Sequence, residues 1–178
     1  MKSKDLCRKE AREIWRAFLA DPSRVGKLLA NLQREVSSVR GLVIAYAAMP
    51  TELNVLPALK FPVFLPRTTS DTEMEFLKAE SPGNLVPGRF GILEPPAENP
   101  CLPRLPGPED FVIVPTLAVN KERFRLGKGG GYYDRQRQLL KGAVKSAAIP
   151  FELMEMQFES LAHDMQIDVL ITERGVFK

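Results

Sequence analysis

Apolar positions near the start of the chain recur every three to four residues, which is the spacing of an amphipathic helix. The pattern predicts a helix over residues 3–19, with the serine at its first position as the N-cap. Lys4, Arg8 and Arg12 recur every four residues and share a separate, basic face of this helix. A second helix is predicted over residues 24–37.

Six short apolar runs farther along the chain predict β-strands. They cover residues 42–46, 61–66, 74–77, 110–115, 146–151 and 167–173. The run at 110–115 is the clearest, whereas Pro62 argues against a central ladder position for the second run because proline has no amide to donate. Buried runs that alternate with helical segments favour an α/β protein with a largely parallel sheet.

Residues 82–108 contain eight of the fifteen prolines. This density excludes a helix and predicts a long, stiffened loop that crosses the surface or forms the rim of an active site. A linker between domains is the alternative, but only about seventy residues follow it. We therefore expect a single domain over residues 1–178, which is long enough to bury a core.

The composition, 44% hydrophobic and 26% charged, is typical of a globular protein in solution. No apolar run approaches the roughly 20 residues that span a bilayer, and the N-terminus lacks the apolar centre of a signal peptide. We expect a cytoplasmic protein with no membrane partner. Cys7 and Cys101 form no CxxC pair and His163 is the only histidine, so neither a disulfide framework nor a zinc site is expected.

The net charge of +3 is unevenly distributed. Residues 1–40 carry ten Lys or Arg against five Asp or Glu, and residues 120–145 carry eight against two. Residues 150–178 reverse the balance, with two against six. Two basic segments and an acidic one are compatible with a phosphate-rich ligand and its metal, or with ordinary solvated helix faces.

The stretch "RLGKGGGYYDR", residues 125–135, places four glycines within five positions among basic residues. Glycines let backbone amides approach an anion closely, and a helix that starts at the tyrosines adds its dipole. A Walker loop is excluded because Gly129 stands where serine or threonine must follow Gly-Lys, and the GxGxxG fingerprint is broken by Tyr132. Glycine clustering alone also fits a flexible turn, but the basic residues and Asp134 favour a phosphate site.

Together with motifs in a fixed order, this stretch resembles the 5-formyltetrahydrofolate cyclo-ligase family, also called methenyltetrahydrofolate synthetases. The resemblance covers nearly the whole chain. Its motifs are Lys4-x-x-x-Arg8, "YAAMPTE" at 46–52, "LPR" at 65–67, "MEF" at 74–76, "GILEP" at 91–95, "VIVP" at 112–115 and "HDMQIDVLITERG" at 163–175.

The resemblance implies a three-layer α/β/α sandwich around a mainly parallel sheet. It also implies ATP- and magnesium-dependent cyclisation of 5-formyltetrahydrofolate to 5,10-methenyltetrahydrofolate, with release of ADP and phosphate. Phosphorylation would turn the formamide oxygen, a poor leaving group, into one that the neighbouring folate nitrogen can displace. The expected partners are therefore the formyl-folate and ATP, with no nucleic acid, and the expected state is a monomer or weak dimer.

Site residues are implied by the same match. Those for ATP are Lys4, Arg8, Arg125, Leu126, Gly127, Lys128, Gly129, Gly130, Gly131, Tyr132 and Tyr133. Those for the folate are Ala47, Glu52, Lys128, Gly129, Gly130, Gly131 and Tyr132. Asp134 and Asp164 match the magnesium-binding acids, while Lys128 and Arg125 are the expected catalytic residues. His163 is expected to order the loop before Asp164.

The chain departs from the family pattern after the run at 110–115. Thr116 and Val119 stand where the family commonly has glycine and phenylalanine, and Asn120 stands where it has an acid. These changes are expected to alter the loop and the pocket shape more than the phosphate chemistry. Two other functions stay open: a non-catalytic nucleotide- or RNA-binding relative, and a kinase-like enzyme that acts on another small heterocycle.

Overall fold

The computed structural model describes residues 2–161 and 163–178, and within them seven strands form one sheet in the order β11-β10-β9-β6-β1-β2-β3. The strands are β1 (Val43–Ile44), β2 (Val63–Thr68), β3 (Met74–Ala79), β6 (Phe111–Ile113), β9 (Val144–Ala148), β10 (Val169–Thr172) and β11 (Gly175–Phe177). Neighbouring strands from β10 to β2 pair in parallel, and β3 and β11 add antiparallel edges.

The centre of the sheet is buried on both faces, which explains the continuous apolar runs of its strands. Val112 of β6 lies opposite Ile44 of β1 on one side and Lys145 of β9 on the other. The side chains of β6 and β10 are buried throughout. The predicted α/β class with a mainly parallel sheet is confirmed.

Helices α1 (Lys4–Leu19) and α2 (Pro22–Ser37) form where apolar periodicity predicts them. Ser3 caps α1 and accepts a hydrogen bond from the amide of Leu6 at 3.3 Å. The second helix begins two residues earlier than predicted because Asp21 caps it and a proline occupies its first turn.

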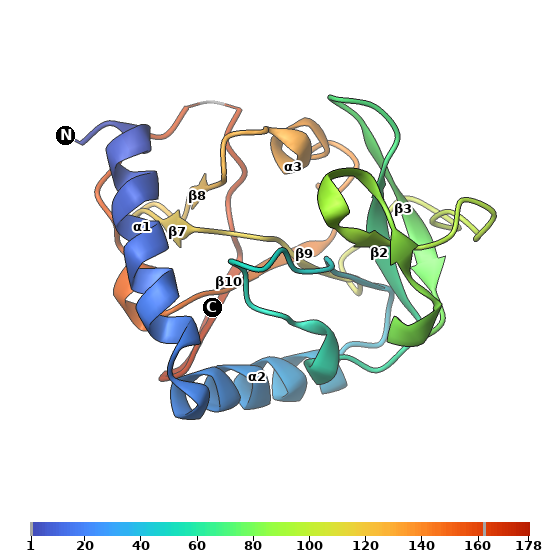
Figure 1. The fold of residues 1–178 in the computed structure, drawn as a ribbon, viewed down its shortest axis with the longest axis horizontal. Helices are drawn as coiled ribbons and strands as arrows, with labels where there is room; N and C mark the ends of the chain where they lie inside the picture. Colours follow the sequence, from blue (N-terminus) through green and yellow to red (C-terminus); the bar gives the residue numbers. More distant parts are fainter. Residues whose placement is uncertain (1, 162) are drawn as a thin grey trace.

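The sheet lies between helical segments (Figure 1). Helix α2 contacts β10 and runs along one side of the sheet, while α3 (Tyr132–Arg135) lies on the opposite side. The helix expected after the glycines is thus a single turn, and turns continue the chain from there to β9. No helix in the described part of the chain is both long and apolar enough to cross a bilayer.

Several strand boundaries differ from the predicted ones at prolines, which cannot donate to a ladder. Strand β2 begins after Pro62, β6 ends before Pro115, and β9 ends before Pro150. Strand β11 was not predicted. It folds back on β10 through a tight turn, in which the Thr172 hydroxyl accepts the amide of Arg174 at 3.0 Å.

The proline-rich segment is more ordered than the predicted loop. It contains the single-turn helices η2 (Pro82–Asn84) and η3 (Arg89–Gly91), and the hairpin of β4 (Val86–Pro87) and β5 (Leu93–Glu94). The hairpin closes because the amide of Gly88 donates to the carbonyl of Ile92 at 2.8 Å. Residues on this segment form part of a cavity wall, as expected for the rim of a site.

Candidate functional site

Two cavities lie on either side of the glycine segment, residues 127–131. The first, the apolar cavity, has a volume of about 260 Å³. The second, the basic cavity, has a volume of about 370 Å³. Arg125, Gly127 and Gly131 line both, so the glycine segment is a wall that the two cavities share.

The two linings differ in chemistry. The apolar cavity is lined by Trp15, Tyr46, Ala47, Met49, Thr51, Glu52, Leu53, Pro66, Thr68, Met74, Ile92, Glu94, Pro115, Thr116, Leu117, Lys128, Gly130, Tyr132 and Tyr133 besides the shared residues. The basic cavity is lined by Lys4, Arg8, Leu126, Gly129, Asp134, Arg135, Leu161, His163 and Asp164 besides the shared residues.

The conformation of the glycine segment requires glycine. Gly129 and Gly131 have φ angles of 109° and 69°, a region that side chains disfavour. A Cβ atom on Gly127 would lie 2.9 Å from Nη1 of Arg125, too close for an ordinary contact. Arg8 Nε donates to the Gly127 carbonyl at 3.0 Å, which ties the segment to helix α1.

Strand β8 (Arg125–Leu126) and helix α3 place Arg125 and Asp134 beside each other. Arg125 is only 5% exposed, and it donates to the carbonyl of Pro115 and to Asp134 Oδ2, both at 2.8 Å. Its Nε atom is buried and has no partner among the described residues. A buried guanidinium that borders both cavities places positive charge at their junction and keeps donors that these two bonds do not use.

Helix α1 supplies two further cations of the basic cavity, and α3 supplies Arg135. Lys4 Nζ lies 2.6 Å from Asp164 Oδ2, and Arg8 Nη1 lies 2.6 Å from Asp5 Oδ1. Burial opposes the charge of Asp164, but Lys4 and the amide of Leu161 outweigh it and lower the pKa of this carboxyl. Asp164 is therefore ionised at neutral pH.

The two acids expected to bind magnesium, Asp134 and Asp164, line the same cavity. Within residues 2–161 and 163–178, no group of three or more His, Cys, Asp or Glu side chains is arranged to hold a metal. Two carboxylates nevertheless fit magnesium, which takes one or two protein oxygens and fills its other positions with water and phosphate oxygens. Calcium or zinc would need more protein ligands at this place.

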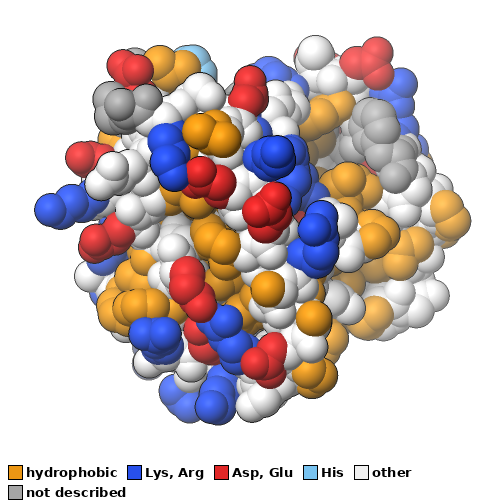
Figure 2. Space-filling view, turned by 60° about the vertical axis from the view of Figure 1, so that its left-hand side comes forward, with side chains coloured by type: hydrophobic (Ala, Val, Ile, Leu, Met, Phe, Trp, Pro, Cys, Tyr) orange, Lys and Arg blue, Asp and Glu red, His pale blue; other side chains and the backbone are white. Residues whose placement is uncertain are grey.

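Basic and acidic side chains are interspersed on the face that carries α1 (Figure 2). Lys4, Arg8, Arg125 and Arg135 line the basic cavity.

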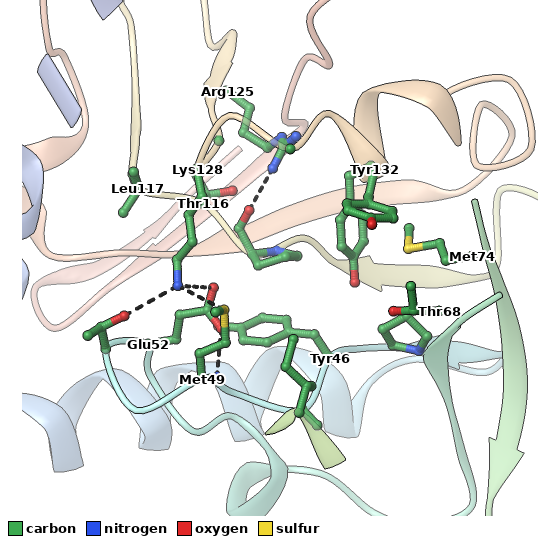
Figure 3. Close-up of a pocket in the computed structure, with 18 of the residues that line it drawn as sticks. Tyr46, Met49, Glu52, Thr68, Met74, Thr116, Leu117, Arg125, Lys128 and Tyr132 are labelled. Carbon is green, nitrogen blue, oxygen red and sulfur yellow. Dashed lines mark hydrogen bonds and ion pairs between the residues drawn. The ribbon is translucent and has the colours of Figure 1, made fainter. Parts of the chain in front are cut away.

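Lys128 lines the apolar cavity and not the basic one. Its Nζ atom lies 2.8 Å from Oε1 of Glu52, while Oε2 of Glu52 accepts the amide of Met49 at 2.8 Å. Figure 3 shows the lysine reaching across the cavity to the loop that follows β1. Lys128 and Glu52, both predicted site residues, thus form one ion pair in the wall of the apolar cavity, which also includes Ala47.

The adjacent tyrosines of α3 differ in their surroundings. Tyr132 is half-buried, and its hydroxyl donates to the carbonyl of Asp71 at 2.6 Å. Tyr133 is buried and packs edge-on against Phe76, with ring centroids 6.3 Å apart. Tyr133 lines the apolar cavity only, although the sequence match placed it among the residues around ATP.

Sequence reasoning missed part of the apolar wall. Met49, Met74 and Glu94 line the cavity, and each lies inside a motif that was quoted for the resemblance. Trp15 also lines it, and its indole N–H donates to the Leu117 carbonyl at 2.9 Å. His163 borders the basic cavity next to Asp164, at the position expected for a loop residue.

The three departures from the family pattern have different consequences. Asn120 is buried and accepts the amide of Phe124 at 2.8 Å, which closes the hairpin of β7 (Ala118–Val119) with β8. Val119 is buried and absent from both cavity walls, whereas Thr116 lines the apolar cavity. Of the three, Thr116 changes the pocket directly.

An α/β sheet with a glycine segment between a basic and an apolar cavity fits the class of proteins that could hold an anionic ligand beside an apolar one. Comparison with known proteins narrows the class. Residues 46–173 match the sequence profile of the 5-formyltetrahydrofolate cyclo-ligase family. The chain belongs to this family.

Relatives and solved structures agree with this membership. The chain is 36% identical over 99 residues to 5-formyltetrahydrofolate cyclo-ligase of Mycolicibacterium smegmatis. This match covers 53% of the chain and 50% of the relative. It is 27% identical over 108 residues to the protein of the same name from Mycoplasma pneumoniae, which covers 61% of the chain and 54% of the relative. The chain thus spans about half the length of the curated relatives it matches.

The structural likeness covers more of the chain. The NMR structure of Aquifex aeolicus 5,10-methenyltetrahydrofolate synthetase superimposes with a TM-score of 0.75 at 28% identity, over 97% of this chain and 91% of that one. A 5,10-methenyltetrahydrofolate synthetase from Mycoplasma pneumoniae gives a TM-score of 0.71 at 22% identity, over 97% and 99%, and shows the shared fold.

Proposed function

We propose that this protein catalyses the ATP- and magnesium-dependent cyclisation of 5-formyltetrahydrofolate to 5,10-methenyltetrahydrofolate, with release of ADP and phosphate. The observation that carries the proposal is the shared wall: residues 127–131 separate a basic cavity from an apolar one, and Arg125 borders both. Because Arg125, Gly127 and Gly131 line both cavities, a phosphoryl group in one would lie next to a heterocycle in the other.

The reaction needs this juxtaposition. The formyl oxygen on folate N5 attacks the γ-phosphorus of ATP, and the bond to ADP breaks. Folate N10 then attacks the formyl carbon and loses its proton, and the carbon–oxygen bond breaks so that the oxygen leaves as part of phosphate, which takes up the proton. Both steps are accelerated mainly by holding the reacting atoms in place and by neutralising charge.

In the basic cavity, Lys4 and Arg8 are the proposed contacts of the ATP phosphates. Both cations are now paired with acids, at 2.6 Å to Asp164 and to Asp5, so a phosphate would replace these partners or share the cations with them. Asp134 and Asp164 would hold magnesium, which neutralises phosphate charge when bound. Lys4 and Arg125, each already bonded to one of these acids, would then be freed to face phosphate oxygens.

In the apolar cavity, Glu52 is the proposed anchor of the pterin, because a carboxylate accepts hydrogen bonds from ring N–H groups. Lys128 orients this carboxylate through their 2.8 Å contact. When the formyl oxygen becomes phosphorylated, the Lys128 ammonium is a cation in this cavity that can stabilise the negative charge developing on the transferred group. Thr116, beside Leu117 in the wall, narrows the cavity where the family commonly has glycine.

The proposal is tested by following the absorbance of methenyltetrahydrofolate with purified protein, ATP, magnesium and 5-formyltetrahydrofolate. Product is expected only when all four components are present. Product without ATP would contradict the proposed mechanism. ATP hydrolysis that is indifferent to the folate, or that responds to another heterocycle instead, would favour the kinase-like alternative.

A further inference from the structure

The apolar cavity contains a buried hydroxyl group that has no partner. Tyr133 is 7% exposed, and its hydroxyl oxygen makes no hydrogen bond to any described residue. Buried hydroxyl groups are almost always paired, because an unpaired one has lost its water without compensation. An exception in a cavity wall points to a partner that the free protein lacks.

Packing does not explain why the residue is tyrosine. Its ring lies edge-on to Phe76 at 6.3 Å and beneath the guanidinium of Arg125 at 5.7 Å. Phenylalanine would keep both contacts and would remove the unpaired group. A tyrosine hydroxyl is protonated at neutral pH, so it is available as a hydrogen-bond donor.

The neighbouring tyrosine shows what a structural hydroxyl looks like at this position. Tyr132 donates to the Asp71 carbonyl at 2.6 Å, and its ring lies 5.0 Å from the guanidinium carbon of Arg135. That hydroxyl ties α3 to the turn between β2 and β3. The hydroxyl of Tyr133 has no such role.

We propose that the Tyr133 hydroxyl donates a hydrogen bond to an acceptor atom on the pteridine ring of the bound folate, and that Tyr133 is a substrate-binding residue rather than an ATP contact. A reduced pteridine offers a carbonyl oxygen and ring nitrogens as acceptors. Tyr133 shares the apolar cavity with Glu52 and Ala47 and is absent from the basic cavity. The inference rests on the proposed function.

Two flexible side chains in the same wall could move aside and let a ligand reach the enclosed hydroxyl. Met49 and Met74 line the cavity, and methionine side chains are unbranched and repack readily. The hydroxyl would then be exposed to the ligand on binding and enclosed without it, while the rest of the tyrosine stays in the core.

The test is Tyr133→Phe, with Tyr132→Phe as the matched control. The Tyr133 variant should raise Tm by about 2–4 °C, because an unpaired buried group is removed. Its kcat/KM for 5-formyltetrahydrofolate should fall about 10-fold, chiefly through KM, while KM for ATP stays within about twofold. Tyr132→Phe should instead lower Tm, since it deletes a hydrogen bond that the folded protein makes.

The outcomes separate the inference from the function on which it rests. A wild-type protein that forms no methenyltetrahydrofolate contradicts the proposed function and the inference with it. An active wild type with an equally active Tyr133→Phe variant overturns the inference alone. So does a variant in which Tm falls together with activity, or in which KM for ATP rises as much as KM for the folate.

Discussion

Replacing Lys128 by methionine removes one ammonium group from the folate-side wall and keeps most of the side-chain length. The structure defines what is lost. Lys128 Nζ lies 2.8 Å from Glu52 Oε1, and it also lies 3.3 Å from the Thr51 hydroxyl and from the sulfur of Met49. The substitution therefore removes a cation from the cavity and leaves the Glu52 carboxylate without its ionic partner.

The two losses have different magnitudes. The Lys128 side chain is 30% exposed and that of Glu52 is 14% exposed, so the pair should stabilise the fold by about 1 kcal/mol or less. A cation that stabilises negative charge in the transition state lowers the activation free energy by roughly 3–4 kcal/mol, which corresponds to a 10²–10³-fold increase in rate. If Lys128 acts on the reaction, kcat should fall by that factor while Tm falls by only a few degrees.

A double-mutant cycle distinguishes a direct role from a role through Glu52. We expect Lys128→Met to lower kcat 10²–10³-fold with little change in KM for ATP, and Lys128→Arg to keep appreciable activity. Glu52→Gln should raise KM for the folate. The double variant should remain as slow as Lys128→Met, because removing the carboxylate does not restore the missing charge.

Two results would refute this reasoning. Normal turnover by Lys128→Met would show that the Lys128 ammonium does not contribute to catalysis. Recovery of kcat in the double variant would mean that Lys128 only neutralises Glu52 and does not touch the reacting atoms.

The remaining predictions address the basic cavity and the fold. Arg8→Ala should raise KM for ATP about 10- to 100-fold with KM for the folate nearly unchanged, as calorimetric titration of each ligand can check. Asp134→Asn should abolish most turnover at low magnesium, with partial rescue at high magnesium, and circular dichroism should show an intact fold despite the lost contact to Arg125. The Arg104 guanidinium, with the backbone amides of Gly107 and Leu42, outweighs the opposing effect of burial and lowers the pKa of Asp110 to about 2. Ionised Asp110 should therefore contribute about 2 kcal/mol of stability above pH 4, lost as the pH falls toward 2; denaturant unfolding of wild type and Asp110→Asn at pH 7 and pH 2 measures this.

Periodicity and motif order predicted the elements of the fold, because the signals are local. The apolar run at 110–115 became the central strand β6, and the repeat over residues 3–19 became α1. The hairpin of β4 and β5 was not predictable in this way. Its two-residue strands are mostly exposed and carry no alternation, and Glu94 is buried because of contacts with β2 that are distant in sequence.

The same limit applies to the site. The sequence identified the glycine segment and its neighbours, but it could not show on which side of that wall each side chain lies. Lys128 and Gly129 are adjacent in sequence, yet they line different cavities. Tyr132 and Tyr133 are adjacent residues of one type, yet the fold gives the first hydroxyl a partner and leaves the second without one among the described residues. Orientation and pairing are properties of tertiary structure, which one sequence does not record.

The central claim is that the protein transfers a phosphoryl group across the glycine wall onto the formyl oxygen of the folate. The most direct measurement uses 5-formyltetrahydrofolate labelled with ¹⁸O in the formyl group and analyses the released phosphate by mass spectrometry. The account predicts that each phosphate carries the formyl ¹⁸O, because that oxygen leaves bonded to phosphorus. Unlabelled phosphate, with the label released as water, would show that ATP is hydrolysed without phosphorylating the folate and would contradict the account.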